Sequence, residues 1–406
     1  MQGELAIVIL FSIATAVALA ARYLKVPYTV ALVLAGLALG PTRLIRPPEL
    51  TQHLLYSVFL PGLLFEAAYH LKFEEFRRSG VRLMALAVPG VIVGMLVTAA
   101  LLVVGARFLR EPLEFGYALV FGAIVAATDP IAVVALFKEV GAPRGLTVLV
   151  EGESLLNDGT AVVLFSVVMT LVGSGGSSWV GAALFFVRVV GIGVGIGAAF
   201  GLGTALIMKR VDDPMIEIAL TAIAAYGSFA FAERVYGSGV LATVTAGMVC
   251  GSYAAKVAMS ETTRNAVESF WGFVAFALNS IVFLLMGFIV DLRALVLAWP
   301  PIVVAFSASL IARAAVVFLV SLALHRTREH VPWAWSAVLS WSGLRGALSM
   351  VLALALPGEF PHRATIVAMT FGVVILSLLV QGLTVSRALR WFGVRPVRPS
   401  EKAREG

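Results

Sequence analysis

The side chains best suited to chemistry in this sequence are carboxylates placed inside long apolar runs. Five acidic residues lie at this depth, and they are Glu66, Asp129, Glu151, Glu153 and Asp158. A charge inside a bilayer is costly, so each group needs a partner, a water-filled cavity or a bound proton. Such residues are therefore candidates for function before they are candidates for structure.

Three of these carboxylates share the segment Glu151–Asp158. On a helix, Ser154 and Asp158 are four residues apart and lie on one face, while Glu153 and Asn157 lie on the neighbouring face. The spacing predicts a polar stripe along a helix that is otherwise apolar.

Sodium ions prefer hard oxygen ligands such as carboxylates, hydroxyls and backbone carbonyls. Asp158, Ser154 and a carbonyl at Thr128 supply that set, and we expect Glu66 nearby. A buried carboxylate can lose its charge by binding either a proton or a cation. We therefore interpret Asp158 as one site for which sodium and protons compete, which is the chemistry of an antiporter.

Other acidic residues have simpler readings. We expect Glu153 to form a structural ion pair with Arg313 or Arg345, and Glu151 to be solvated near a helix end. No histidine competes as a proton carrier, because all five lie at helix ends or in loops, namely His53, His70, His325, His330 and His362.

Two helices are predicted to be broken. In Thr128-Asp129-Pro130 the proline suits the first position of a new helix, and the aspartate suits its N-cap. A second break is predicted at Gly343–Gly346, where two glycines flank Arg345 and the cation can face the C-terminal end of a half-helix.

An internal repeat relates these two breaks. The motif Ala-Gly-x-x-x-Gly occurs at Ala35–Gly40 and again 211 residues later at Ala246–Gly251. Adding 211 to Asp129 reaches a position just before Gly343. The first copy lies in the second predicted helix and the second copy in the ninth, seven helices later, and an odd offset inverts the second copy in the membrane. Paired interruptions of inverted repeats indicate the binding site of a transporter.

The composition predicts an all-α polytopic membrane protein. Hydrophobic residues make up 60% of the 406 residues, charged residues 13%, and the mean hydropathy is +0.98. The single cysteine, Cys250, excludes a disulfide framework. About thirteen apolar runs can cross a bilayer, with cores near 4–21, 27–42, 52–71, 80–106, 113–138, 145–172, 179–208, 214–234, 239–252, 262–290, 296–324, 332–356 and 363–388. The fifth and twelfth of these helices are the broken ones. We interpret the N-terminal run as a transmembrane helix that is retained, and not as a cleaved signal peptide.

The distribution of basic residues predicts the orientation. With a cytoplasmic C-terminus, the inner loops and the tail hold 20 Lys and Arg, and the outer loops hold 7. This asymmetry agrees with the positive-inside rule. An odd number of helices then places the N-terminus outside the cell membrane.

The sequence resembles the electroneutral NhaP branch of the cation:proton antiporters, which is related to animal sodium/proton exchangers. The matching motifs are Leu60–Ala67, Ala127–Val133, Glu151–Asp158, Gly343–Ala347 and Val380–Thr384. Together they extend over nearly the whole membrane domain, so the resemblance implies the inverted-repeat antiporter fold seen in NhaA.

The resemblance also implies a homodimer and a division of labour along the chain. Residues 1–75 and 212–294 would form a dimerisation domain, and residues 76–175 and 295–392 a mobile core that moves like an elevator. Residues 176–211 would link them, and residues 393–406 would form a short cytoplasmic tail. Many relatives carry long regulatory tails, whereas this sequence has only a short segment after the thirteenth helix. Regulation through a ligand-binding tail is therefore not expected.

For the site, the resemblance makes Asp158 the ion and proton carrier, lined by Ser154, Thr128 and Glu66. Glu153 would pair with Arg313, and Asn157 would stand beside the carrier. Asp129 and Arg345 would offset the ends of the broken helices. An Asn-Asp pair in this family accompanies one-for-one exchange, so Asn157-Asp158 implies electroneutrality.

Other functions remain open at this point. A potassium/proton exchanger on the same scaffold is the near alternative, because residue types do not fix ion size. An intramembrane aspartyl protease could use Asp129 and Asp158, but its Gly-x-Gly-Asp motif is absent. A channel is the third alternative, but a single carrier carboxylate between broken helices fits alternating access better than it fits a channel. We expect a transporter that is no enzyme and has no cofactor, with monovalent cations, protons and lipid as partners and no nucleic acid.

Overall fold

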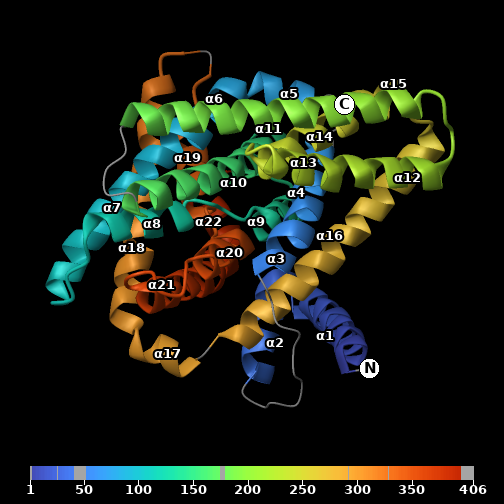
Figure 1. The fold of residues 1–406 in the computed structure, drawn as a ribbon. Helices are drawn as coiled ribbons and strands as arrows, with labels where there is room; N and C mark the ends of the chain where they lie inside the picture. Colours follow the sequence, from blue (N-terminus) through green and yellow to red (C-terminus); the bar gives the residue numbers. More distant parts are fainter. Residues whose placement is uncertain are drawn as a thin grey trace. The chain divides into compact units, whose positions relative to one another are not determined.

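The computed structural model describes residues 2–24, 26–40, 52–173, 179–290, 292–327 and 329–394, and these residues form helices without any strand (Figure 1). They divide into two compact units. The first unit comprises Met1–Pro48, Ser79–Asn157 and Val282–Gly406, and the second comprises Glu49–Arg78 and Asp158–Ile281. The tail at 395–406 and the loop arginines Arg43, Arg46 and Arg328 lie outside the described residues.

The first unit contains both broken helices. Its helices are α1 (Gln2–Leu24), α2 (Tyr28–Leu39), α6 (Gly80–Ala85), α7 (Val91–Phe108), α8 (Phe115–Ile124), α9 (Ile131–Val140), α17 (Leu292–Leu297), α18 (Trp299–Leu324), α19 (Trp333–Trp341), α20 (Ala347–Leu354), α21 (Arg363–Leu376) and α22 (Leu383–Trp391). The π-helical turns η3 (Leu86–Gly90) and η6 (Ser377–Gly382) continue α6 into α7 and α21 into α22. Helix α18 packs against α7, α19 and α21, so it forms the centre of this unit.

The second unit is organised around α14, which packs against α4, α11 and α13. Its helices are α3 (Gln52–Leu54), α4 (Leu60–His70), α5 (Phe73–Arg78), α11 (Trp179–Met208), α12 (Pro214–Ala222), α13 (Ser228–Arg234), α14 (Gly239–Val249) and α15 (Ala255–Val257), with π-helical turns η2 (Leu55–Phe59), η4 (Ile223–Gly227) and η5 (Cys250–Ala254). Two long helices, α10 (Arg144–Gly173) and α16 (Glu261–Ile289), begin in one unit and end in the other.

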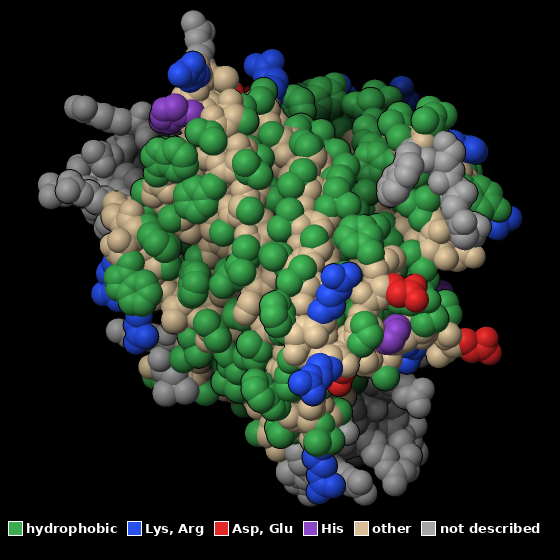
Figure 2. Space-filling model, turned by 90° about the vertical axis from the view of Figure 1, so that its left-hand side faces the viewer, with side chains coloured by type: hydrophobic (Ala, Val, Ile, Leu, Met, Phe, Trp, Pro, Cys, Tyr) green, Lys and Arg blue, Asp and Glu red, His purple; other side chains and the backbone are tan. Residues whose placement is uncertain are grey.

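The surfaces are those of a membrane protein. Among the described residues, eight helical runs are long and apolar enough to cross a bilayer, and shorter apolar helices accompany them. Val180, Leu184 and Val187 of α11 are 68%, 66% and 66% exposed. Hydrophobic side chains also predominate on the face drawn in Figure 2. Exposed apolar surface of this kind is typical of a face that contacts lipid or another chain, and with the eight spanning runs it confirms the prediction of a polytopic membrane protein. The count of thirteen spans stays a prediction, as do the predicted domain limits.

Both predicted breaks are present. Helix α8 ends at Ile124 and α9 begins at Ile131, while α19 ends at Trp341 and α20 begins at Ala347. The segments between them, 125–130 and 342–346, are not helical. Non-helical backbone at membrane depth is tolerated only where protein groups satisfy it, and here both segments are largely buried.

The repeated glycine motifs pack in equivalent ways. A Cβ added at Gly36 of α2 would clash with the backbone of Leu284 and Gly287 in α16. A Cβ added at Gly247 of α14 would clash with the backbone of Phe65 in α4. Each motif therefore lets its helix approach a neighbour's backbone closely, once in each unit. The inverted-repeat prediction placed these two glycines in equivalent positions.

Candidate ion-binding site

The first break is held by polar side chains of α10. Ser154 Oγ donates to the Thr128 carbonyl, and Thr128 Oγ1 lies 3.3 Å from Ser154 Oγ. Asn157 Nδ2 donates to Thr128 Oγ1 at 2.8 Å, and its Oδ1 accepts the Thr128 N–H at 3.4 Å. All three residues are at most 6% exposed. The structure thus brings together the predicted ligands Ser154 and Thr128 with the predicted neighbour Asn157.

The ends of the broken helices also have partners. Asp129 Oδ1 accepts the N–H of Ile131, the first residue of α9, at 3.0 Å. The N-cap of α9 is Pro130, so the helix begins one residue later than predicted, and Asp129 lies just before the cap. Arg345 Nη1 donates to the carbonyls of Ala126 and Ala127, at 3.2 and 3.3 Å, just beyond the C-terminal end of α8. A cation there opposes the negative end of the helix dipole. Arg345, which belongs to the second break, therefore stabilises the backbone of the first break.

The second break also contacts the first break through its own backbone. The Asp129 N–H donates to the Leu344 carbonyl at 2.8 Å. A Cβ added at Gly346 would clash with the Asp129 side chain, so the glycine is needed for the two segments to approach. The two breaks are therefore linked to each other through backbone and side chain.

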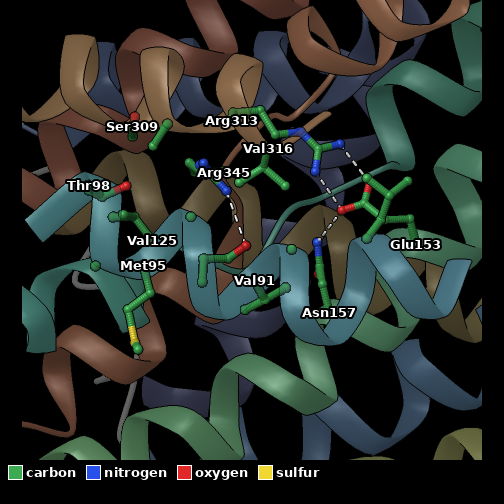
Figure 3. Close-up of a pocket in the computed structure, with 16 residues that line it drawn as sticks. Val91, Met95, Thr98, Val125, Glu153, Asn157, Ser309, Arg313, Val316 and Arg345 are labelled. Atoms are coloured by element: carbon green, nitrogen blue, oxygen red, sulfur yellow. Dashed lines mark hydrogen bonds and ion pairs between the residues drawn. The ribbon is translucent and has the colours of Figure 1, made fainter. Parts of the chain in front are cut away.

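A buried ion pair connects α10 with α18. Arg313 donates from Nη1 and Nη2 to the two carboxylate oxygens of Glu153, both at 2.6 Å, and also donates to the Leu339 carbonyl of α19. Glu153 Oε1 accepts a further bond from Asn157 Nδ2 at 3.0 Å. Glu153, Arg313 and Arg345 line a cavity of about 30 Å³, and Figure 3 shows the contact between Arg313 and Glu153 there. The expected partner of Glu153 is therefore Arg313, and the pair connects the first break to the second.

Asp158 and Glu66 belong to the second unit. Asp158 follows Asn157 on α10 and lies four residues after Ser154, which is about one helical turn. Glu66 lies on α4, with its Oε1 3.3 Å from Nδ1 of His70. The roles of both carboxylates in one site with Thr128 stay predictions.

Some polar residues carry contacts that the sequence reading did not assign. Ser377 Oγ accepts the Arg345 N–H at 3.1 Å, and Gln381 Nε2 donates to the Trp341 carbonyl at 2.9 Å. The signal was available, because Ser377 and Gln381 have the spacing of Ser154 and Asp158 in the preceding half.

The list of five intramembrane acidic residues was incomplete. Glu217 lies in α12 within an apolar span and is 0% exposed. Its place in the sequence did not indicate this burial, because it lies only four residues after the exposed N-cap Asp213. Glu151, which we expected to be solvated, lies 3.7 Å from Lys138 Nζ and its side chain is 22% exposed.

Comparison with known proteins decides the family. The model of the family described as "Sodium/hydrogen exchanger, transmembrane" matches residues 7–391. The chain belongs to the sodium/hydrogen exchanger family. This membership confirms the resemblance drawn from the motifs, and it identifies a transporter family and not an enzyme family. The alternatives of a protease and a potassium exchanger are not favoured.

Individual relatives agree with this family assignment. The Na(+)/H(+) antiporter ApNhaP of Aphanothece halophytica is 38% identical over 387 residues, which cover 94% of this chain and 73% of the relative. The Na(+)/H(+) antiporter NhaP of Pseudomonas aeruginosa is 36% identical over 357 residues, covering 86% and 84%. The solved structure of the sodium proton antiporter MjNhaP1 from Methanocaldococcus jannaschii has a TM-score of 0.80 at 21% identity, covering 97% of this chain and all of that one. The predicted antiporter fold is therefore confirmed.

Proposed function

We propose that this exchanger carries one sodium ion in exchange for one proton, and that Asp158 binds the two in turn. The observation that supports this most strongly is the buried Thr128–Ser154–Asn157 cluster at the first break, because Ser154 and Asn157 lie four residues and one residue before Asp158 on α10. Relatives that cover most of this chain are named as Na(+)/H(+) antiporters.

Sodium would be held by oxygen atoms that are already close together. The Thr128 carbonyl and the Ser154 hydroxyl are in direct contact, and both are ligands that a hard cation accepts. To bind a cation between them, the Ser154 hydroxyl would rotate its hydrogen away from the Thr128 carbonyl. The Asp158 carboxylate would then supply the negative charge.

The charges around the cluster support one-for-one exchange. Glu153 is engaged by the bidentate Arg313 contact, and Asn157 is neutral and hydrogen-bonded. Neither residue is therefore suited to carry a second charge, because removing Glu153 from Arg313 would leave two unpaired buried ions. A single carboxylate that holds either H⁺ or Na⁺ moves the same charge in both directions.

Alternating access would move the two breaks together. Arg345 donates to carbonyls of the first break, and the Leu344 carbonyl accepts a bond from Asp129. Because these bonds link the two breaks to each other, the broken helices would move together as one rigid part. An elevator mechanism requires such a part. We further propose a homodimer, with the N-terminus outside and the C-terminus in the cytoplasm.

The test is exchange in liposomes with an acidic interior and a pH-sensitive dye. Addition of external sodium should drive proton efflux that does not depend on the membrane voltage, and Asp158→Asn should abolish it. Glu151→Gln is the matched control, because it removes a carboxylate of the same helix that contacts Lys138, and it should retain exchange.

Other outcomes would change the proposal. Voltage-dependent efflux would contradict one-for-one exchange while leaving Asp158 as carrier. Full activity of Asp158→Asn would exclude this residue as the carrier. Efflux driven by potassium but not by sodium would change the assigned ion.

A further inference from the structure

Glu217 is a fully enclosed carboxylate that the transport motif does not use. It lies in the first turn of α12, and its side chain is 0% exposed. No donor among the described residues is within hydrogen-bonding distance of either carboxylate oxygen. Natural proteins rarely leave both oxygens of a buried carboxylate without a donor.

The helix that carries Glu217 packs on an aromatic cluster. Thr221, one turn further along α12, is also fully buried and accepts the Trp271 Nε1–H at 2.9 Å. Ile218 and Ala222 of the same helix pack on the cluster that contains Phe65 and Trp271. The helix therefore presents this face to the aromatic core of the second unit.

The charged groups near Glu217 offer little compensation for a negative charge. Asp212 and Asp213 precede it and repel a carboxylate, and Tyr69 of α4 lies within electrostatic range. Around Tyr69 are also Cys250 of η5 and Arg264 and Glu268 of α16. Lys209 and Arg210 follow the end of α11 at Met208, and Lys209 Nζ lies 3.3 Å from the Tyr253 hydroxyl.

An ionised Glu217 would be costly here. Burial of an unpaired carboxylate costs several kcal/mol, so such a group neutralises or finds a cation. No described residue forms an ion pair with it. The neutral acid fits this enclosure better than the carboxylate does.

Glu217 lies close in the chain to residues that are exposed to solvent. The preceding Asp212 and Asp213 are exposed, and Asp213 caps α12 by accepting the N–H groups of Met215 and Ile216. Only one helical turn separates that exposed cap from Glu217. Opening of the first turn of α12 would therefore be enough to admit water.

We propose that Glu217 is a second proton-binding site, separate from the transport carboxylate, whose proton keeps α12 packed on the aromatic core of the second unit. Loss of the proton would require a cation such as Arg264 to approach or the first turn of α12 to open. The pH on the side of the loop 209–213 would then control how firmly this helix packs.

The test compares the thermal unfolding of the full-length protein in detergent between roughly pH 5 and pH 8. Glu217→Gln keeps the size of the neutral acid, and Glu217→Met is a second variant in case the amide packs poorly. Glu268→Gln is the matched control, because it removes an exposed carboxylate of the same neighbourhood. The test does not depend on exchange activity, so it stands apart from the proposed function.

If Glu217 holds a proton, wild type loses stability relative to both neutral variants as the pH rises. The sign follows because the folded chain keeps a proton that the unfolded chain releases, and the folding equilibrium changes by up to tenfold per pH unit. The control should keep a constant difference from wild type. A pH-independent difference for both Glu217 variants would overturn the proposal. A sodium-dependent rise in melting temperature that wild type shows and both variants lose would assign the site to a cation instead.

Discussion

The two broken helices lie in the same unit, but each takes its side-chain partners from a different helix. At the first break, the Thr128 carbonyl accepts the Ser154 hydroxyl of α10. At the second, the Arg345 N–H donates to the Ser377 hydroxyl of η6. Both serines are followed four residues later by a second polar residue, Asp158 in one half and Gln381 in the other.

That difference separates a titratable residue, Asp158, from a neutral one, Gln381. Gln381 donates to the Trp341 carbonyl, and an amide does not change its charge with pH. Asp158 can bind a proton or a cation in turn. The two halves therefore share a way of supporting broken backbone, and in our proposal only the first half adds ion chemistry to it.

The largest expected effect in this comparison comes from the ion pair that joins the halves. Arg313→Met leaves the Glu153 carboxylate buried without its cation, and should destabilise the protein by about 3–5 kcal/mol. The double variant Glu153→Gln/Arg313→Met should lose clearly less than the two single losses combined. Unfolding midpoints of all four proteins in detergent measure this, and simple additivity would show that the pair is not coupled.

A smaller effect is expected where the two breaks approach each other. Gly346→Ala places a methyl group against the Asp129 side chain and should cost about 1–3 kcal/mol, as overpacking does. Gly94→Ala in α7 is the control, because its methyl group would meet only the Val316 side chain, at an ordinary contact distance of 3.5 Å. Equal unfolding midpoints for the two variants would mean that the breaks do not press on each other at Gly346.

The cap of the first break should contribute less again. Asp129→Ala removes the acceptor of the Ile131 N–H and should destabilise by about 1 kcal/mol. Asp129→Asn retains an acceptor oxygen at that position and should remain near wild type in the same unfolding measurement. A loss in Asp129→Asn as large as in the alanine variant would indicate that the charge, and not the cap, is what matters.

The smallest effect is expected at the neutral half. Gln381→Ala leaves the Trp341 carbonyl without its side-chain donor, with an expected loss of about 0.5 kcal/mol, the low end for a single hydrogen bond. Sodium-driven proton efflux in liposomes should persist, unlike in Asp158→Asn. If Gln381→Ala folds normally and yet abolishes efflux, the second break takes part in ion binding and the comparison has to be revised.

Much of the fold was predictable from short-range patterns. The length of the apolar runs determines where helices can cross lipid, and proline with a preceding aspartate determines where a helix restarts. The breaks at Thr128–Pro130 and Gly343–Gly346, and the close-packing glycines Gly36 and Gly247, follow from such local rules. These features depend on residues within a few positions of one another, so the sequence alone carries them.

The pairing of polar groups was decided by the tertiary structure. Local patterns left both Arg313 and Arg345 as partners of Glu153, and the packing of α10 against the second break assigns Arg313 to it and Arg345 to the first break. Glu217 was missed for the same reason. Whether a carboxylate near a helix end is solvated or enclosed depends on helices that are far away in the sequence. Helix α12 packs through Ile218 and Ala222 on the aromatic cluster of α4 and α16, and Thr221 accepts a bond from Trp271 of α16.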